Sequence, residues 1–185
     1  MLCDFIIFLS NILLMIGKNW GKNAWYFLHI TALNYDNINY RRIKYLEFYK
    51  NFISLIPCPI CKRHFIDNLK KIKYNLENNI NSDNIFNWTV DLHNEVNRMN
   101  GKDVISHLEA KILHRGPISN KKINKFVLQF IKFNGNRRDK INNFIKSVVA
   151  IYPQKNKRVL MNKYIVDSNT QFKRTIYLFL LFSGK

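Results

Sequence analysis

Two cysteines three residues apart are the feature of this sequence best suited to chemistry. Cys58 and Cys61 lie in Pro57-Cys58-Pro59-Ile60-Cys61, and the 185-residue chain has one other cysteine, Cys3. If the pair begins a helix, both sulfurs lie on one face and can form a disulfide. A helix N-terminus stabilises a thiolate through its free N–H groups and its dipole. Because thiolates are the nucleophiles of thiol–disulfide exchange, the pair suits dithiol oxidation and reduction.

The cysteine pair alone is compatible with other kinds of site. A thioredoxin-like site needs strands alternating with helices, and the sequence has no such pattern. A zinc site could use Cys58, Cys61 and His64, with His29 or His93 as the fourth ligand. Structural zinc sites usually carry a second pair of ligands, which is absent here. Redox chemistry is therefore favoured, and zinc binding stays open at this point.

The spacing of apolar residues predicts helices on both sides of the pair. One helix starts near Trp20, a second spans Arg41–Ile56 and ends before Pro57, and a third runs from Cys58 through Leu69. A fourth extends from Ile85 to Gly101, with Ser82 or Asp83 as its cap, and the intervening residues 75–84 are predicted to form a loop. Four helices over this length predict a small all-α bundle.

The second half of the chain is predicted to be a separate helical unit. Its clearest signal is an apolar stripe from Ile141 to Tyr152 at helical spacing, preceded by an apolar face from Phe126 to Ile131. The segment Thr175–Phe182 is apolar and has no firm assignment. We therefore divide the chain into an N-terminal extension (1–17), a bundle (18–103) and a basic helical C-terminal domain (104–185).

The formal charge of +18 is concentrated in the C-terminal half. Residues 1–103 carry 13 Lys and Arg against 9 Asp and Glu, whereas residues 104–185 carry 17 against 3. A basic surface of this size predicts contact with a polyanion, although a solvated surface explains it equally well. Residues 2–16 are apolar but contain Asp4 and fall short of the ~20 residues of a membrane span. We expect no stable span, with membrane anchoring by residues 2–16 left open.

Two longer motifs flank the cysteine pair and decide between the alternatives. Residues 20–29 have the form WGxxxWxxLH, and residues 88–102 have the form WxxxxHNxVNxxxGK. In this order around Pro-Cys-x-x-Cys, they resemble the Erv/ALR family of FAD-linked sulfhydryl oxidases over residues 18–102. The basic C-terminal half is similar, more weakly, to the extra helical domain of giant-virus members. Each motif residue alone could be ordinary core or surface; together, in this order, they favour the family.

The resemblance implies a cofactor, a set of site residues and a reaction. FAD would be bound by side chains of the first and fourth helices together with the second cysteine: Trp20, Gly21, Lys22, Trp25, His29, Cys61, Trp88, His93, Asn94, Val96, Asn97 and Lys102. Cys61 would face the flavin, Cys58 would exchange with the substrate, and no metal is expected. The implied activity is oxidation of protein dithiols, with electrons passing to flavin and then to O2 to give H2O2.

The resemblance also implies partners and a location. Dithiol proteins would be the substrates, a homodimer would be the assembly, and host cytoplasm or a virion would be the location of a viral member. Many family members carry a second cysteine pair on a tail, whereas here Cys3 is alone. We therefore expect substrates to dock directly on Cys58. The alternative hypothesis is a non-enzymatic helical module that binds zinc and a polyanion.

Overall fold

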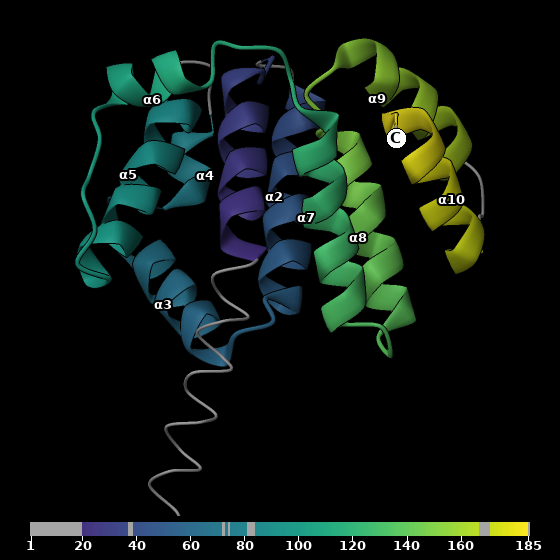
Figure 1. Cartoon of the computed structure of the whole chain (residues 1–185), viewed down its shortest axis with the longest axis horizontal. Helices are drawn as coiled ribbons and strands as arrows, with labels where there is room; N and C mark the ends of the chain where they lie inside the picture. The colour runs from purple at the N-terminus through teal and green to yellow at the C-terminus, as the bar shows by residue number, and fades with distance from the viewer. Residues whose placement is uncertain are drawn as a thin grey trace, which may run out of the picture.

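The computed structural model describes residues 20–36, 39–71, 73, 75–80, 84–166 and 171–184. Predictions on the N-terminal extension, Cys3, the anchor at 2–16 and the caps Ser82 and Asp83 lie outside these residues. The described part consists of helices and contains no strand, so the all-α prediction is confirmed (Figure 1). No helix within it is long and apolar enough to cross a membrane.

The four predicted helices of the first half are all present. They are residues 20–33, α2 (Asn39–Leu55), α3 (Pro59–Lys70) and α5 (Ile85–Met99). Gly101 has a φ of 62°, a left-handed conformation that glycine adopts without strain, and α5 ends just before it as expected. The loop predicted at residues 75–84 was wrong in part, because Asn75 caps a short helix, α4 (Leu76–Asn79), through the N–H of Asn78.

The second half folds into α6 (His107–Leu113), α7 (Asn120–Phe133), α8 (Arg138–Ala150), α9 (Lys155–Met161), the π-helix η2 (Asn162–Val166) and α10 (Phe172–Ser183). The apolar stripe of α8 is fully buried, as its spacing predicts. The unassigned apolar segment near the C-terminus lies within α10. In Figure 1, α3 to α6 lie on one side of the central helices, and α9 and α10 lie on the other.

The two halves share one hydrophobic core. Phe27 of the first helix stacks on Phe126 of α7 with ring centroids 5.1 Å apart, and Phe52 of α2 stacks on Phe130 at 5.5 Å. Phe144 of α8 stacks on the same Phe130 at 5.1 Å. The division of the chain at residue 103 stays a prediction, but aromatic rings of α7 and α8 pack against rings of the first half within this core.

Candidate functional site

The cysteine pair occupies the N-terminus of α3. Cys58 is the N-cap residue, and its sulfur accepts a hydrogen bond from the N–H of Cys61 at 3.2 Å. Pro59 starts the helix, where its missing N–H costs nothing. Cys58 and Cys61 form a disulfide. Cys58 is only 4% exposed, whereas Cys61 is half-buried. The structure therefore presents the second cysteine more openly than the first.

One face of α3 connects the disulfide to an aromatic cluster. Cys61 and Phe65 are four residues apart, so their side chains lie on the same face of the helix. The ring of Phe65 is 6.3 Å from Trp25 of the first helix and 5.4 Å from Phe52 of α2. The sulfur-bearing face of α3 is thus turned toward the helix that carries the WGxxxWxxLH motif.

Flat side chains from three parts of the chain meet beside this face. Trp25 stacks on His93 of α5 with ring centroids 4.1 Å apart and planes 5° from parallel. His93 in turn lies 5.2 Å from His29, and His29 lies 5.2 Å from His114. We call this set the ring cluster; its members are Trp25, Tyr26, His29, Phe65, Phe86, His93 and His114.

Hydrogen bonds fix the protonation of two histidines in the ring cluster. The hydroxyl of Thr89 donates to the carbonyl of Phe86 at 2.7 Å, so it accepts from Nδ1 of His29 at 3.1 Å. Nε2 of His29 is then the acceptor in its 2.9 Å contact with Nδ1 of His93. On this basis the His29 ring is neutral, and the His93 ring carries a proton on Nδ1. Among the described residues Nε2 of His93 has no hydrogen-bond partner, and in the neutral ring this nitrogen is an acceptor.

Burial explains why these histidines stay neutral. It lowers the pKa of His29 well below its usual value, and the neighbouring His93 and His114 lower it further. Burial, with help from Lys102 and His114, lowers the pKa of His93 to about 4. Burial and Lys122 lower the pKa of His114 as well. An uncharged, flat, largely apolar surface results, with hydrogen-bonding atoms at its edges.

The lowered pKa of His93 predicts a pH-dependent stability. Between about pH 6.5 and pH 4 the unfolded chain protonates this histidine and the folded protein does not, so the free energy of unfolding falls as the pH falls through this window. Each pH unit in this window costs ~1.4 kcal/mol, so at pH 4.5 His93 alone should have lowered the free energy of unfolding by about 2–3 kcal/mol. Urea unfolding at pH 7 and pH 4.5 should show that the free energy of unfolding falls less for His93→Phe than for the unaltered protein. Equal losses in both proteins would contradict the assignment.

His114, which follows α6, is not among the residues predicted from the sequence. It reaches the ring cluster because the side chain of Asn94 holds the chain leading to α6, bonding both the N–H and the carbonyl of Ile105 at 3.1 and 2.7 Å. Nδ1 of His114 is buried and has no hydrogen-bond partner in the part of the chain that the structure describes. No periodic pattern could have revealed this residue, because its contact with His29 joins positions far apart in the sequence.

Three of the predicted cofactor residues, whose role in binding FAD stays a prediction, contact residues outside the ring cluster. Trp20 packs in the core between Phe52 and Phe130, at 6.3 and 5.5 Å, on another side of its helix from Trp25. Trp88 is buried edge-on against Tyr49 of α2. The side-chain amide of Asn94 hydrogen-bonds to both the carbonyl and the N–H of Ile105, so Asn94 positions the segment that leads to α6.

The remaining predicted residues lie in the first helix and in α5, which also carry members of the ring cluster, or just after α5. Val96 and Asn97 are half-buried on α5, and the carbonyl of Asn97 accepts from the N–H of Lys102 at 2.9 Å. Lys102 is exposed and lies close enough to His93 to lower its pKa. Lys22 is also exposed, and a side chain added at Gly21 would meet open space. The cations thus lie at the solvent side, where a phosphate group could be neutralised.

These residues fit FAD. A flavin or adenine ring needs flat apolar surfaces with a few polar atoms, and the ring cluster supplies both. His114 offers a buried nitrogen without a partner, and Lys22 and Lys102 offer positive charge for a diphosphate. Cys61 lies on the face of α3 that contacts this cluster. The arrangement can therefore hold a redox cofactor next to a redox disulfide.

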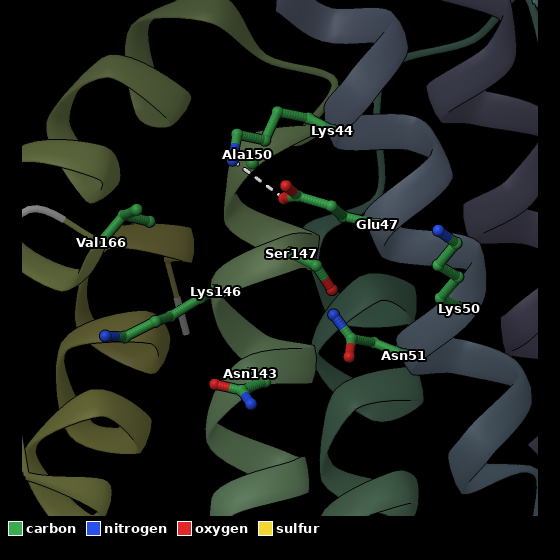
Figure 2. A pocket seen from close by; sticks show the side chains of 9 residues that line it. All are labelled: Lys44, Glu47, Lys50, Asn51, Asn143, Lys146, Ser147, Ala150 and Val166. Atoms are coloured by element: carbon green, nitrogen blue, oxygen red, sulfur yellow. Dashed lines mark hydrogen bonds and ion pairs between the residues drawn. The ribbon is translucent and has the colours of Figure 1, made fainter.

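A groove lies between α2 and α8, and neither Cys58 nor Cys61 lines it (Figure 2). It measures about 330 Å³ and is lined mainly by polar and charged side chains, among them Lys44, Glu47, Lys50, Asn51 and Lys146. Lys44 and Glu47 pair within α2 at 2.8 Å. Sites for small organic molecules are usually lined by apolar and aromatic groups, so this groove does not compete with the ring cluster as a flavin site.

The zinc alternative is not supported by the described residues. Both cysteine sulfurs are joined in the disulfide, whereas zinc binds thiolates. Within the described ranges no group of three or more His, Cys, Asp or Glu side chains is placed to hold a metal ion. His29 and His93 hydrogen-bond to each other instead, and His64 is exposed on α3.

Comparison with known proteins defines the class. Residues 22–115 match the model of the Erv1 / Alr family. The chain is 31% identical over 98 residues to "Probable FAD-linked sulfhydryl oxidase R368" of Acanthamoeba polyphaga mimivirus, covering 52% of this chain and 68% of the relative. It is 32% identical over 104 residues to the "FAD-linked sulfhydryl oxidase" of an African swine fever virus isolate, covering 55% and 85%. No solved structure matches.

The chain belongs to the Erv1 / Alr family. The matched region runs past the predicted boundary at residue 103 and includes α6 and His114. Helices α7 to α10 lie beyond it. The residue that sequence reasoning missed is therefore within the family region, while the basic helices after it are additional to that region.

Proposed function

We propose that this protein is an FAD-dependent thiol oxidase that forms disulfides in protein substrates through Cys58 and Cys61. The observation that carries the proposal is a disulfide at the N-terminus of α3, with Cys61 on the same helix face as Phe65, whose ring contacts Trp25 of the ring cluster. FAD supplies the capacity to accept two electrons from a dithiol and pass them to O2, which gives H2O2. The names of the viral relatives support the same activity.

The chain's own residues account for the thiol chemistry. A substrate thiolate attacks the sulfur of Cys58, the Cys58–Cys61 bond breaks, and Cys61 leaves as a thiolate. A second substrate thiolate then breaks the mixed disulfide, which releases oxidised substrate and leaves Cys58 reduced. The free N–H groups of α3 and the adjacent Lys62 and Arg63 stabilise the negative sulfur.

Access to Cys58 is part of the proposal. Cys58 is nearly buried, so its sulfur must become exposed before a substrate can attack it. The preceding Pro57 lies in the short connection between α2 and α3. Movement of this connection exposes the sulfur without unfolding either helix. We keep Cys58 as the substrate-facing cysteine and Cys61 as the cysteine that faces FAD.

The cofactor residues that we propose form two groups. Trp25, His29, His93 and Cys61 provide the surface for the rings. Lys22 and Lys102 provide charge at the solvent side. Two further motif residues, Trp20 and Trp88, pack in the core behind these groups. Asn94 of α5 holds the segment that leads to α6.

Dithiol proteins are the substrates in this proposal, and O2 is the electron acceptor. We also propose a homodimer and a polyanion contact by the basic helices of residues 104–185, in host cytoplasm or a virion. The support for these is the family, the viral relatives and the charge of the C-terminal half. Binding that weakens steeply with salt would support the polyanion contact.

The absorption spectrum of the purified protein tests the proposed function. We expect a yellow protein with one flavin per chain that consumes O2 when a dithiol is added and releases H2O2 in equal amount. A colourless protein that contains zinc and loses structure with a chelator would refute it.

A further inference from the structure

The C-terminal end of α2 is held by the turn between α7 and α8. The side-chain nitrogen of Asn134 donates to the carbonyl of Leu55 at 3.0 Å, and Nη1 of Arg137 donates to the carbonyl of Ser54 at 3.2 Å. Nζ of Lys62 donates to the same Ser54 carbonyl at 3.3 Å. The last four carbonyls of a helix have no partner within it, so these donors complete α2 from outside.

The turn is itself rigid. Asn134 is buried, and its side chain also donates to the carbonyl of Phe130 at 3.1 Å. Nη1 of Arg137 contacts Oδ1 of Asn134 at 3.3 Å, and the N–H of Arg137 bonds the carbonyl of Asn134 at 2.8 Å. Arg137 is therefore held in place at the end of α2 by its own turn.

The end of α2 leads directly to the redox disulfide. Cys58 lies three residues after Leu55, the last residue of α2, and immediately before Pro59, the first residue of α3. It therefore lies between the negative end of one helix dipole and the positive end of another. The end of α2 opposes a thiolate at Cys58, and the N-terminus of α3 favours it. The charges of Arg137 and Lys62 at Ser54 offset the opposing end.

We propose that the α7–α8 turn is a positioning device for the redox pair, in which Arg137 raises the thiolate population of Cys58 by offsetting the dipole of α2. The proposal rests on the proposed function. In the reduction step a substrate dithiol gives two electrons to the disulfide, the S–S bond breaks and a substrate disulfide forms. One proton goes to solvent for each cysteine that remains a thiolate. By stabilising that thiolate, Arg137 makes the disulfide a stronger oxidant.

This role gives the helices beyond the family region a function in the reaction. Arg137 and Asn134 lie outside residues 22–115, the part of the chain that matches the family model. Their contacts with Ser54 and Leu55 cross from that added region to the helix before the cysteines. The added region therefore acts on the site through the end of α2.

Arg137→Gln tests the charge, because glutamine can still donate a hydrogen bond to Ser54. The reduced full-length protein is alkylated across a pH series, and modification at Cys58 is followed by peptide mass spectrometry. We expect the alkylation rate at neutral pH to fall about two- to fivefold, since one charge at a helix C-terminus is worth ~0.3–1 kcal/mol. The equilibrium with reduced and oxidised glutathione should shift by a similar factor toward the disulfide.

Two control variants separate this role from a merely structural one. Arg137→Lys keeps the charge and should restore the rate, and Arg138→Gln removes an adjacent exposed charge and should change nothing. Flavin content and melting temperature should stay the same in all three variants. Equal alkylation profiles for Arg137→Gln and Arg138→Gln would sink the inference. The alkylation assay needs no flavin, so failure of the oxidase proposal would appear separately, as absent flavin or oxygen consumption in the unaltered protein.

Discussion

Cys61→Ser is expected to abolish oxygen consumption with a dithiol while FAD remains bound. A serine hydroxyl cannot form the disulfide that accepts electrons from the substrate, so the variant has no path from the substrate to the cofactor. The ring cluster does not depend on this sulfur, because its contacts run between Trp25, His29 and His93. Oxygen-electrode assays should show a loss of at least about a thousandfold, comparable to removal of a catalytic nucleophile. The flavin absorbance per chain should be unchanged.

Cys58→Ser is the matched control, because it also loses the disulfide but keeps the sulfur that we place against the cofactor. It should lose turnover equally and retain a free thiolate at Cys61, which should add a long-wavelength absorption band that Cys61→Ser lacks. When each variant is mixed with the disulfide form of a substrate protein, the Cys58 thiolate of Cys61→Ser should attack that disulfide, displace one substrate thiolate and remain trapped as a mixed disulfide. Full oxidase activity in Cys61→Ser, or trapping only through Cys61, would show that the roles are wrongly assigned.

The helices could be predicted because their apolar spacing reports burial on one face. The run from Ile141 to Tyr152 is the clearest case, and each apolar position in it is buried against α2 or its neighbours. The short helix α4 could not be predicted, because it has no fully buried side chain and depends on the local cap at Asn75. A helix without a buried face leaves no periodic pattern in the sequence.

The spacing of residues within a motif was not enough to predict which of them contact the ring cluster. Trp20 and Trp25 belong to one motif, but five helical positions turn their side chains about 140° apart, at ~3.6 residues per turn. Only Trp25 faces His93, while Trp20 enters the core beside Phe130 of α7. Helical geometry alone could have separated the two tryptophans. The identity of the partner on each face could not be obtained from the motif, since it comes from distant segments.

Long-range contacts also explain the residues that the sequence did not reveal. His114 enters the ring cluster because Asn94 fixes Ile105, and Arg137 reaches α2 because the α7–α8 turn packs against it. A motif records which residues occur together in the chain. It does not record that the α7–α8 turn packs against the C-terminal end of α2, the helix before the cysteines. That contact connects the second half of the protein to the proposed chemistry.

His93→Ala is expected to weaken FAD binding by about ten- to a hundredfold. His93 is the ring that stacks on Trp25, and its Nε2 is the free acceptor of the Thr89–His29–His93 chain. Removing it eliminates a stacking surface and a polar edge together, and a stacked aromatic contact with a base is worth ~1–3 kcal/mol. Flavin retained after dialysis, and flavin fluorescence released on dilution, should both report the loss.

Trp20→Phe is the control that separates the structural assignment from the motif. The sequence motif places Trp20 in the cofactor site, whereas the structure places it in the core between Phe52 and Phe130. Its replacement should lower the melting temperature, because a large buried ring is reduced, and should leave the affinity for FAD within about twofold of its original value. If Trp20→Phe instead released FAD as readily as His93→Ala, the cofactor would have to extend to the Trp20 side of the first helix. The ring cluster would then be only part of the site.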